Sequence, residues 1–371
     1  MATALGGGVV GRLSNVENIT GSAFNDSLTG DAGANVFRGL NGNDTLTGLG
    51  GNDTYIFVDG FGQDTIVEAA AGGSDTLDFS AVTNGLSLNI NASSLTGGYG
   101  ANSITLNGLT AEVLIASLAD DIFNFTAGGS FNGSINGFTG IDTFDYHLYT
   151  GGVNVNLSTG AATGTLGVSN IENLIGSNYA DTLTGDDHDN VITGGAGNDM
   201  LTGLGGNDLY LFQDNFGVDS IVEAALGGED TMDFTAVTQM LTMTVTDTTV
   251  HVTYGVNDAS HTGIYVEHFL GALGQTTLDL SAYLTGRHVV LTNLGTDHGF
   301  MGYVEYTPTP YTFDNIDRII GTTAADVSLT GMNAIALWTL TEETGGSYVS
   351  TNTLTFTGFE SLIGGSDADT F

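Results

Sequence analysis

The chain has 371 residues, of which 57 are glycine, 2 are proline and none is cysteine. It carries 42 acidic residues against 4 basic ones, and its formal net charge is −38. This composition excludes collagen, a disulfide framework and a thiolate metal site, and the charge repels nucleic acid and anionic membrane surfaces.

Hydrophobic residues make up 41% of the chain, which is too many for a disordered linker. The chain can therefore bury apolar surface, and its glycines are expected to serve tight turns. So large a negative charge also repels itself, so we expect bound cations to balance it at defined places. No apolar run reaches the length of a membrane span, and the first residues lack the basic-then-apolar pattern of a signal peptide.

A nine-residue repeat begins at Gly21, with the copies GSAFNDSLT, GDAGANVFR, GLNGNDTLT and GLGGNDTYI. A fifth copy, DGFGQDTIV, starts at Asp59 after a two-residue slip. Position six of the copies holds an acid or its amide: Asp26, Asn35, Asp44, Asp53 and Asp64. Position eight is always apolar: Leu28, Phe37, Leu46, Tyr55 and Ile66.

Two further modules connect this block to the next. In the first, an acid stands four residues before a small residue, at Glu17, Glu112, Glu172, Glu267, Asp317 and Glu360. This acid is expected to orient a turn, with a calcium ligand as the alternative. In the second, Asp-Thr-apolar-Asp-aromatic occurs at residues 75–79, 142–146 and 230–234. The two acids resemble a catalytic pair, but their repetition favours a role in the repeat.

The whole block returns 155 residues later, between Gly176 and Ile221, with the same slip and the same amide in the second copy. Its position-six residues are Asp181, Asn190, Asp199, Asp208 and Asp219. Its position-eight residues are Leu183, Ile192, Leu201, Tyr210 and Ile221.

The period is lost over residues 236–311, where five histidines fall between His251 and His298. Five tyrosines share the stretch: Tyr254, Tyr265, Tyr283, Tyr303 and Tyr306. These side chains indicate either a ligand-facing or transition-metal surface, or exposed strand positions in a diverged repeat. A small β-sandwich is a conceivable fold for this stretch.

Residues 344–371 align without gaps on residues 96–123, so we expect the chain to be part of a longer array. The predicted organisation has six segments. They are a leading strand at 1–20, a first block at 21–80, connecting β repeats at 81–175, a second block at 176–235, a diverged β region at 236–311 and an incomplete third unit at 312–371.

Short runs of Thr, Val, Ile and Leu alternate with Gly, Asn and Asp turns, which is strand spacing. Turns at a fixed nine-residue step wind a coil. The predicted fold is all-β, a parallel β-solenoid or β-roll with two nonapeptides per coil, calcium-binding turns and diverged β modules between the blocks. Its core is thin, because each copy places one apolar side chain inward.

The copies match the G-G-x-G-x-D-x-U-x pattern, in full at residues 194–199. They resemble the RTX, or haemolysin-type, calcium-binding repeat family. The resemblance implies Ca²⁺ between turns two repeats apart, with about three turn pairs in each block. These pairs are Asp26 with Asp44, Asn35 with Asp53, Asp44 with Asp64, Asp181 with Asp199, Asn190 with Asp208, and Asp199 with Asp219. We also expect ligands from the best-matched turns, at Gly39, Asn41, Gly48, Gly50, Gly194, Ala196, Gly203 and Gly205.

Some copies depart from the pattern. Phe24 and Tyr179 replace the glycine at position four, so the first turn of each block is expected to be a poor site. Asn35 and Asn190 offer a neutral oxygen, so their sites are expected to be weaker. The alternative for every position-six residue is that its side chain only caps the turn by bonding backbone N–H groups.

The chain shows no nucleophile elbow, no zinc-protease helix motif and no phosphate-binding loop, so we expect no enzymatic activity. The resemblance implies a calcium-dependent structural or adhesive segment of a bacterial protein, extracellular or at the cell surface, exported by type I secretion. Partners would be calcium and either further copies of the chain or a cell-surface or host ligand, without nucleic acid or membrane insertion. Two alternatives remain open. One is a self-assembling surface-layer or filament subunit, and the other is the calcium-binding region of an enzyme or toxin whose catalytic domain lies elsewhere.

Overall fold

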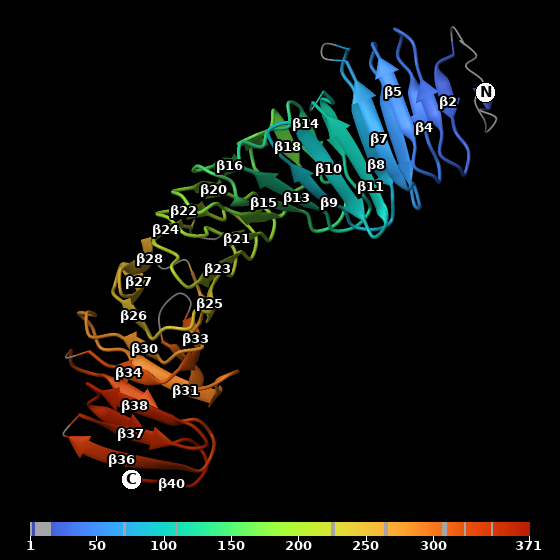
Figure 1. The fold of residues 1–371 in the computed structure, drawn as a ribbon. Helices are drawn as coiled ribbons and strands as arrows, with labels where there is room; N and C mark the ends of the chain where they lie inside the picture. The colour runs from blue at the N-terminus through green and yellow to red at the C-terminus, as the bar shows by residue number, and fades with distance from the viewer. Residues whose placement is uncertain are drawn as a thin grey trace. The chain divides into compact units, whose positions relative to one another are not determined.

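The computed structural model describes residues 2–3, 16–69, 72–108, 110–223, 227–262, 266–305, 310–322, 324–342 and 344–371. These residues form strands joined by turns, and none of them is helical (Figure 1). Among them there is accordingly no helix long and apolar enough to cross a membrane. Most of the predicted leading strand, Tyr265 and Tyr306 lie outside the described residues.

The strands of each nonapeptide block wind as a parallel coil. Ser27 of β3 (Ser27–Thr29) pairs with Thr45 of β5 (Thr45–Leu49), and Val36 of β4 (Val36–Arg38) pairs with Thr54 of β6 (Thr54–Val58). Both partners are 18 residues apart, which is two nonapeptides. β-branched and aromatic residues suit these short strands, and Gly-Asn-Asp turns end them. The predicted parallel β-solenoid with two repeats per coil is confirmed.

Two compact units make up the chain, divided between Tyr179 and Ala180. In the first unit, one sheet is parallel throughout. Its strands, in spatial order, are β1 (Ala2–Thr3), β2 (Asn18–Thr20), β4, β6, β8 (Thr76–Ala81), β12 (Val113–Ile115), β14 (Ser134–Asn136) and β18 (Gly167–Ser169).

The second sheet of this unit is mostly parallel but contains two antiparallel pairings. Its order is β3, β5, β7 (Gln63–Glu68), β11 (Asn102–Asn107), β10 (Ser94–Tyr99), β9 (Ser87–Ile90), β13 (Ile122–Thr126), β15 (Thr143–Leu148) and β19 (Asn173–Ile175). The unit also contains a small antiparallel hairpin, formed by β16 (Asn154–Asn156) and β17 (Ala161–Ala162).

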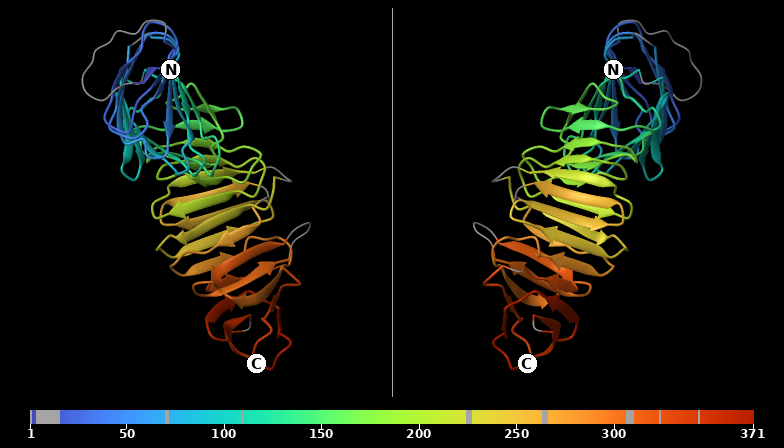
Figure 2. Two further views of the ribbon diagram at one scale, coloured as in Figure 1. Left: turned by 90° about the vertical axis from the view of Figure 1, so that its right-hand side faces the viewer. Right: turned by 90° about the vertical axis from the view of Figure 1, so that its left-hand side faces the viewer.

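The second unit has the same construction, and Figure 2 shows its strands stacked one beside another. One sheet runs β21 (Val191–Thr193), β23 (Leu209–Gln213), β25 (Thr231–Ala236), β29 (His268–Leu270), β33 (Tyr311–Ile316), β32 (Phe300–Val304), β31 (His288–Leu294), β35 (Ser328–Thr330) and β39 (Ser361–Ile363).

The other sheet of the second unit begins with β20 (Thr182–Thr184), β22 (Met200–Thr202), β24 (Val218–Val222), β28 (Asn257–Thr262), β27 (Thr249–Tyr254) and β26 (Leu241–Val245). It continues with β30 (Thr276–Asp279), β34 (Arg318–Ile320), β38 (Thr353–Thr357), β37 (Gly345–Val349), β36 (Ala336–Glu342) and β40 (Asp369–Thr370).

The antiparallel pairings come from hairpins inserted into single coils. In the first unit, β10 and β11 stand between β7 and β9, while on the opposite sheet β8 and β12 pair directly. Over residues 236–311 the same device is used, because β26, β27 and β28 form a meander whose outer strands join the parallel ladder. The described residues of this region continue the two sheets of the solenoid and do not form a separate β-sandwich.

The core lies between the two sheets of each unit. Position-eight side chains are at most 4% exposed, as predicted for inward residues: Leu28, Phe37, Leu46, Tyr55, Ile66, Leu183, Ile192, Leu201, Tyr210 and Ile221. An aromatic cluster lies near the end of each block, where Phe57 stacks on Phe79 at 4.3 Å and Phe212 on Phe234 at 4.4 Å. Such pairs contribute about 0.5–1.5 kcal/mol each beyond the burial of their area.

Candidate calcium sites

In the first block, the position-six carboxylates link neighbouring coils along the turn edges. Oδ1 of Asp44 accepts a hydrogen bond from the backbone N–H of Asp26 at 2.8 Å, and Oδ1 of Asp64 accepts one from Asp44 at 2.9 Å. On the other edge, Oδ1 of Asp53 accepts one from Asn35 at 2.7 Å. The structure thus brings together every position-six pair expected for this block.

The second block repeats these contacts. Oδ1 of Asp199 accepts a hydrogen bond from the N–H of Asp181 at 2.9 Å, and Oδ1 of Asp219 accepts one from Asp199 at 3.0 Å. Oδ1 of Asp208 accepts one from Asn190 at 2.8 Å. One oxygen of each of these acids therefore caps a turn by accepting a backbone N–H, as the capping alternative predicts. The second oxygen of each carboxylate remains to be accounted for.

The second carboxylate oxygens are buried and have no hydrogen-bond partner within the described part of the chain. This holds for Oδ2 of Asp44, Asp53, Asp199, Asp208 and Asp219. A buried charged oxygen without a partner costs free energy unless a cation or a proton neutralises it. Ca²⁺ is a hard cation that takes carboxylate and carbonyl oxygens, so these residues fit the ion that the sequence implies.

The glycine at position one lets the orphan oxygen of Asp44, Asp53, Asp199 and Asp208 approach the backbone of the turn closely. A Cβ added to Gly39 would lie 2.1 Å from Oδ2 of Asp44, and one added to Gly194 would lie 2.5 Å from Oδ2 of Asp199. The position-three residues lie at the outside of the turn, exposed at Asn41 and half-buried at Gly50, Ala196 and Gly205. The calcium role of these glycine, position-three and position-six residues stays a prediction.

Leucine replaces glycine at position two in three of the four best-matched turns. The backbone nevertheless keeps the left-handed conformation, with φ of 73° at Leu40, 78° at Leu49 and 85° at Leu204, against 93° at Gly195. This region favours glycine, so the leucines carry backbone strain that the surrounding turn imposes.

The first turn of the first block differs from the inner turns. Oδ2 of Asp26 accepts hydrogen bonds from the backbone N–H and the hydroxyl of Ser22, at 2.6 and 2.9 Å. Phe24, at position four, is 74% exposed. In the second turn, Oδ1 of Asn35 accepts the N–H of Asp31 at 2.9 Å. These oxygens already have protein partners, which is the physical reason to expect weaker metal binding there.

Burial sets the protonation of the inner carboxylates. Desolvation raises the pKa of Asp199 and Asp208 to about 7 and that of Asp219 to about 8, while the backbone hydrogen bonds oppose the rise. Burial likewise raises the pKa of Asp44 and Asp53. Without a cation, the folded turns therefore hold protons that an unfolded chain, with carboxyl pKa values of about 4, releases.

Calcium affinity is expected to fall as the pH falls through 8 to 6. Each raised pKa means that protonation stabilises the metal-free fold below about pH 7, and calcium must displace that proton. The expected loss is about tenfold per pH unit for each carboxylate that exchanges a proton for the ion. Isothermal titration of calcium at pH 8 and pH 6 measures it, and equal affinities at both values would contradict the buried titration.

The acid that stands four residues before a small residue proves to orient the turn of the preceding coil. Oε2 of Glu112 accepts a hydrogen bond from the N–H of Asp75 at 2.8 Å, and Oε2 of Glu172 accepts one from Asp142 at 2.7 Å. Three later copies make the same kind of contact: Glu267 with Asp230, Asp317 with Thr276, and Glu360 with Asp326. These acids continue the carboxylate-to-N–H ladder beyond the blocks.

Four acids at the ends of the blocks join these edges, although the repeat pattern did not predict them as metal ligands: Glu68, Asp75, Glu223 and Asp230. Oδ1 of Asp75 accepts the N–H of Asp53 at 2.8 Å, so Asp75 is the next position-six residue on that edge. The signal was present in the Asp-Thr-apolar run that Asp75 shares with Asp44 and Asp64. It was obscured because the spacing from Asp64 to Asp75 in the sequence exceeds the nine residues of the repeat.

The histidines of residues 236–311 do not form a common site in the structure. His251 contacts Asp258 at 3.1 Å, His261 contacts the backbone oxygen of Ile221 at 3.0 Å, and His288 contacts Ser328 at 2.7 Å. His298 lies 3.2 Å from Asp317. Within the described residues, the groups with metal-binding geometry contain only acids. Each of these histidines therefore has separate contacts, which do not converge on one site.

RTX calcium-binding nonapeptide repeats match residues 20–55 and 171–210, in four copies. The two blocks contain calcium-binding RTX repeats, and calcium is the ion expected at them. No curated protein matches the chain. Among solved structures, the extracellular lipase LipA from Serratia marcescens matches 68% of this chain at 14% identity, with a TM-score of 0.20. The chain spans 38% of the length of that lipase.

Proposed function

We propose that this chain is a calcium-dependent structural and adhesive segment of a secreted or cell-surface bacterial repeat protein, without enzymatic activity of its own. Its calcium-binding RTX blocks fold when they bind the ion, and the coils between and after them extend the folded segment. The proposal includes export through type I secretion.

The observation that carries this proposal is the row of buried carboxylate oxygens without partners along the turn edges. Two successive acids on one edge, Asp199 and Asp219, are each at most 3% exposed. A chain with a net charge of −38 gains little from burying such groups unless a cation joins them. Calcium binding is then part of the folding free energy, because the turns do not exist in the unfolded chain.

The distribution of the acids supports a structural role in preference to a catalytic one. The carboxylate-to-N–H contact recurs coil after coil, from Asp44 in the first block to Glu360 near the end of the chain. An active site needs one such arrangement, whereas a solenoid needs one in every turn. The repetition favours a load-carrying or spacing function.

Calcium dependence also supports a location outside the cell. Calcium-binding modules of extracellular proteins have Kd values of about 10⁻⁴–10⁻³ M. Affinity in that range would leave the blocks unfolded and exportable inside the cell and would fold them on release. The charge of −38 keeps the metal-free chain soluble and extended.

Sedimentation velocity and bead adhesion together test this proposal. We expect the full chain to sediment as a compact monomer in millimolar calcium and as an expanded monomer in chelator. Beads that carry the chain should be retained on polystyrene under flow in calcium, and should be released in chelator or when Asp199 and Asp208 are both replaced by Ala.

Each part of the proposal has its own contrary result. Large assemblies that form only in calcium would replace the adhesive segment with a filament or surface-layer subunit. Equal retention of the beads with and without calcium would contradict the adhesive role while leaving calcium-dependent folding intact.

A further inference from the structure

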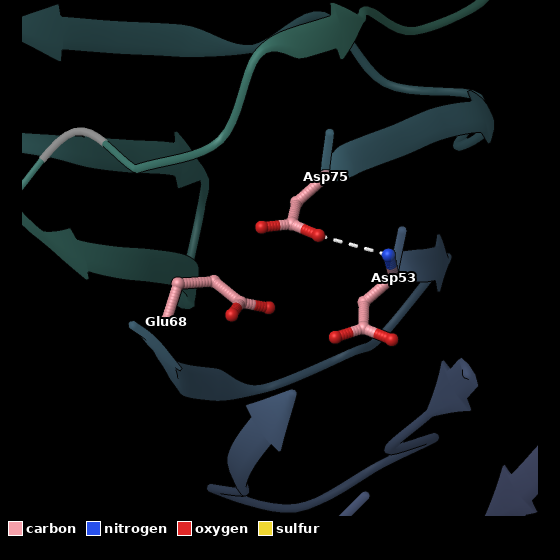
Figure 3. Close-up of side chains that lie close together, drawn as sticks. All are labelled: Asp53, Glu68 and Asp75. Atoms are coloured by element: carbon pink, nitrogen blue, oxygen red, sulfur yellow. Dashed lines mark hydrogen bonds between the residues drawn. The ribbon is translucent and has the colours of Figure 1, made fainter. Parts of the chain in front are cut away.

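The last turn of each nonapeptide block gathers three carboxylates around one space. In the first block these are Asp53, before β6, Glu68, at the end of β7, and Asp75, before β8 (Figure 3). In the second block they are Asp208, Glu223 and Asp230, each 155 residues later. One oxygen from each acid lies within 4.8 Å of the others. We call these sets the first and second carboxylate triads.

The distances suit a single calcium ion. Calcium lies about 2.3–2.6 Å from its oxygen ligands, so two ligands on opposite sides of the ion are about 4.6–5.2 Å apart. Three oxygens within 4.8 Å of one another can therefore touch the same ion. Three carboxylates at this separation repel one another strongly when no cation lies between them.

One oxygen of each acid in the first triad is already held by the protein. Oδ1 of Asp53 and Oδ1 of Asp75 accept backbone N–H groups at 2.7 and 2.8 Å, and Oε1 of Glu68 accepts the hydroxyl of Tyr55. These bonds fix the carboxylates in place. They leave Oδ2 of Asp53, Oε2 of Glu68 and Oδ2 of Asp75 buried and without a partner among the described residues.

The first triad is closed off from solvent on the side of the two aspartates, since Asp53 is 0% and Asp75 1% exposed. Its glutamate is half-buried. Unpartnered oxygens on side chains this deeply buried point to a ligand, which a solvated acidic patch does not.

The second triad repeats these contacts and is more enclosed. Oδ1 of Asp208 accepts the N–H of Asn190 at 2.8 Å, and Oδ1 of Asp230 accepts the N–H of Asp208 at 2.9 Å. Oε1 of Glu223 accepts the hydroxyl of Tyr210 and the N–H of Gly203, the latter at 3.2 Å. The remaining oxygens of these three acids are buried and have no hydrogen-bond partner among the described residues.

Glycine keeps both spaces open. A Cβ on Gly48 would lie 2.1 Å from Oε1 of Glu68 and 2.4 Å from Oδ2 of Asp53. A Cβ on Gly203 would lie 2.0 Å from Oδ2 of Asp208 and 2.5 Å from Oε1 of Glu223. Any other residue at these two positions would collide with the carboxylates of the triad and displace them.

We propose that each triad is a calcium site of its own kind, which closes its block and binds the ion more tightly than the turns before it. Glu68 and Glu223 stand one step after position nine, where the first three copies of each block are followed by the position-one glycine. They add a third carboxylate to an edge whose other turns supply two or fewer. Calcium affinity rises with the charge of the ligand set, so these are the first sites to fill as calcium increases.

The test compares calcium titrations of the full chain and two double variants. Glu68→Gln with Glu223→Gln removes one charge from each triad and keeps the shape. The matched control, Asp59→Asn with Asp214→Asn, removes the same charge from exposed turn residues of the same two copies. We expect the triad variant to lose the two tightest sites, with at least tenfold weaker binding of two ions, and the control to match the parent chain.

A second measurement uses terbium, which replaces calcium and luminesces when a nearby tyrosine absorbs light. The Tyr55→Phe, Tyr210→Phe variant keeps all six carboxylates but loses the phenols that contact them. We expect it to bind calcium in unchanged stoichiometry while most of the terbium emission at low occupancy disappears. This terbium measurement tests the triad sites even if the Glu→Gln double variant fails to fold.

The inference rests on calcium binding by the blocks, and the two fail differently. If the parent chain bound no calcium, the proposed function would fall. If the parent bound calcium but the triad variant and its control gave the same isotherm, or if low-occupancy terbium emission survived in the phenylalanine variant, only the triad sites would be refuted.

Discussion

Removal of calcium at low ionic strength is expected to abolish most of the β-structure of residues 21–80 and 176–235. The cause is the set of buried acids along the turn edges, whose unpartnered oxygens include Oδ2 of Asp44, Asp53, Asp199 and Asp208. Without the ion, these groups must take up protons or repel one another, and the thin core of the blocks cannot offset that cost. Circular dichroism of the chain in chelator and in excess calcium measures the loss.

Two comparisons separate specific binding from general charge screening. At about 1 M NaCl the screening length is about 3 Å, so diffuse repulsion is largely removed. If repulsion alone unfolded the chain, this salt would restore the β-signal in chelator as fully as calcium does. We expect it to restore only a part, because monovalent ions do not satisfy the six to eight oxygen contacts that calcium makes.

Replacement of Asp199 and Asp208 by Ala provides the second comparison. The change removes two negative charges, so it would stabilise the chain if repulsion were the whole cause. We expect the opposite in calcium, with a lower midpoint of urea unfolding. The control replaces the exposed acids Asp187 and Glu229 by Ala and should leave the midpoint almost unchanged. Full native signal in chelator at low salt would remove the basis of the proposed function.

Gly217→Ala is expected to lower the free energy of unfolding more than any other single added methyl group in the second unit. Gly217 has φ of +93°, and a Cβ there would lie 1.6 Å from the backbone oxygen of Gly197, with which it forms a parallel bridge. Strain in the left-handed region costs about 1–3 kcal/mol. Overpacking adds about 1–3 kcal/mol, and more where the obstacle is backbone that belongs to the next coil.

Two other glycines separate these causes. Gly255 has φ of +58° but no atom within 4 Å of an added Cβ, and Gly151 has open space without a positive φ. We expect urea unfolding in saturating calcium to show a loss of about 1–2 kcal/mol for Gly255→Ala. Gly151→Ala should show little loss or a small gain. Equal effects of all three substitutions would mean that the coil spacing near Gly197 is looser than the structure shows.

The sequence by itself determined the coil, its inward residues and the edge to which each position-six residue belongs. A nine-residue step with one apolar position places Leu46 directly beside Leu28 when the chain winds at 18 residues per coil, and the structure has that pair in register. These features are local and periodic. Each depends on turn chemistry repeated at fixed spacing, so counting along the chain recovers them.

Only the tertiary structure decided the hairpin insertions and the two triads. β9, β10 and β11 are consecutive in sequence, yet their arrangement places β11 beside β7, and no local pattern specifies that partner. Likewise Glu68 meets Asp53 and Asp75 only after a coil lengthened from 18 to 22 residues has closed, as the contact between Asp53 and Asp75 shows. Where the period is broken, the register is set by packing between distant segments, and spacing in the sequence no longer measures distance in space.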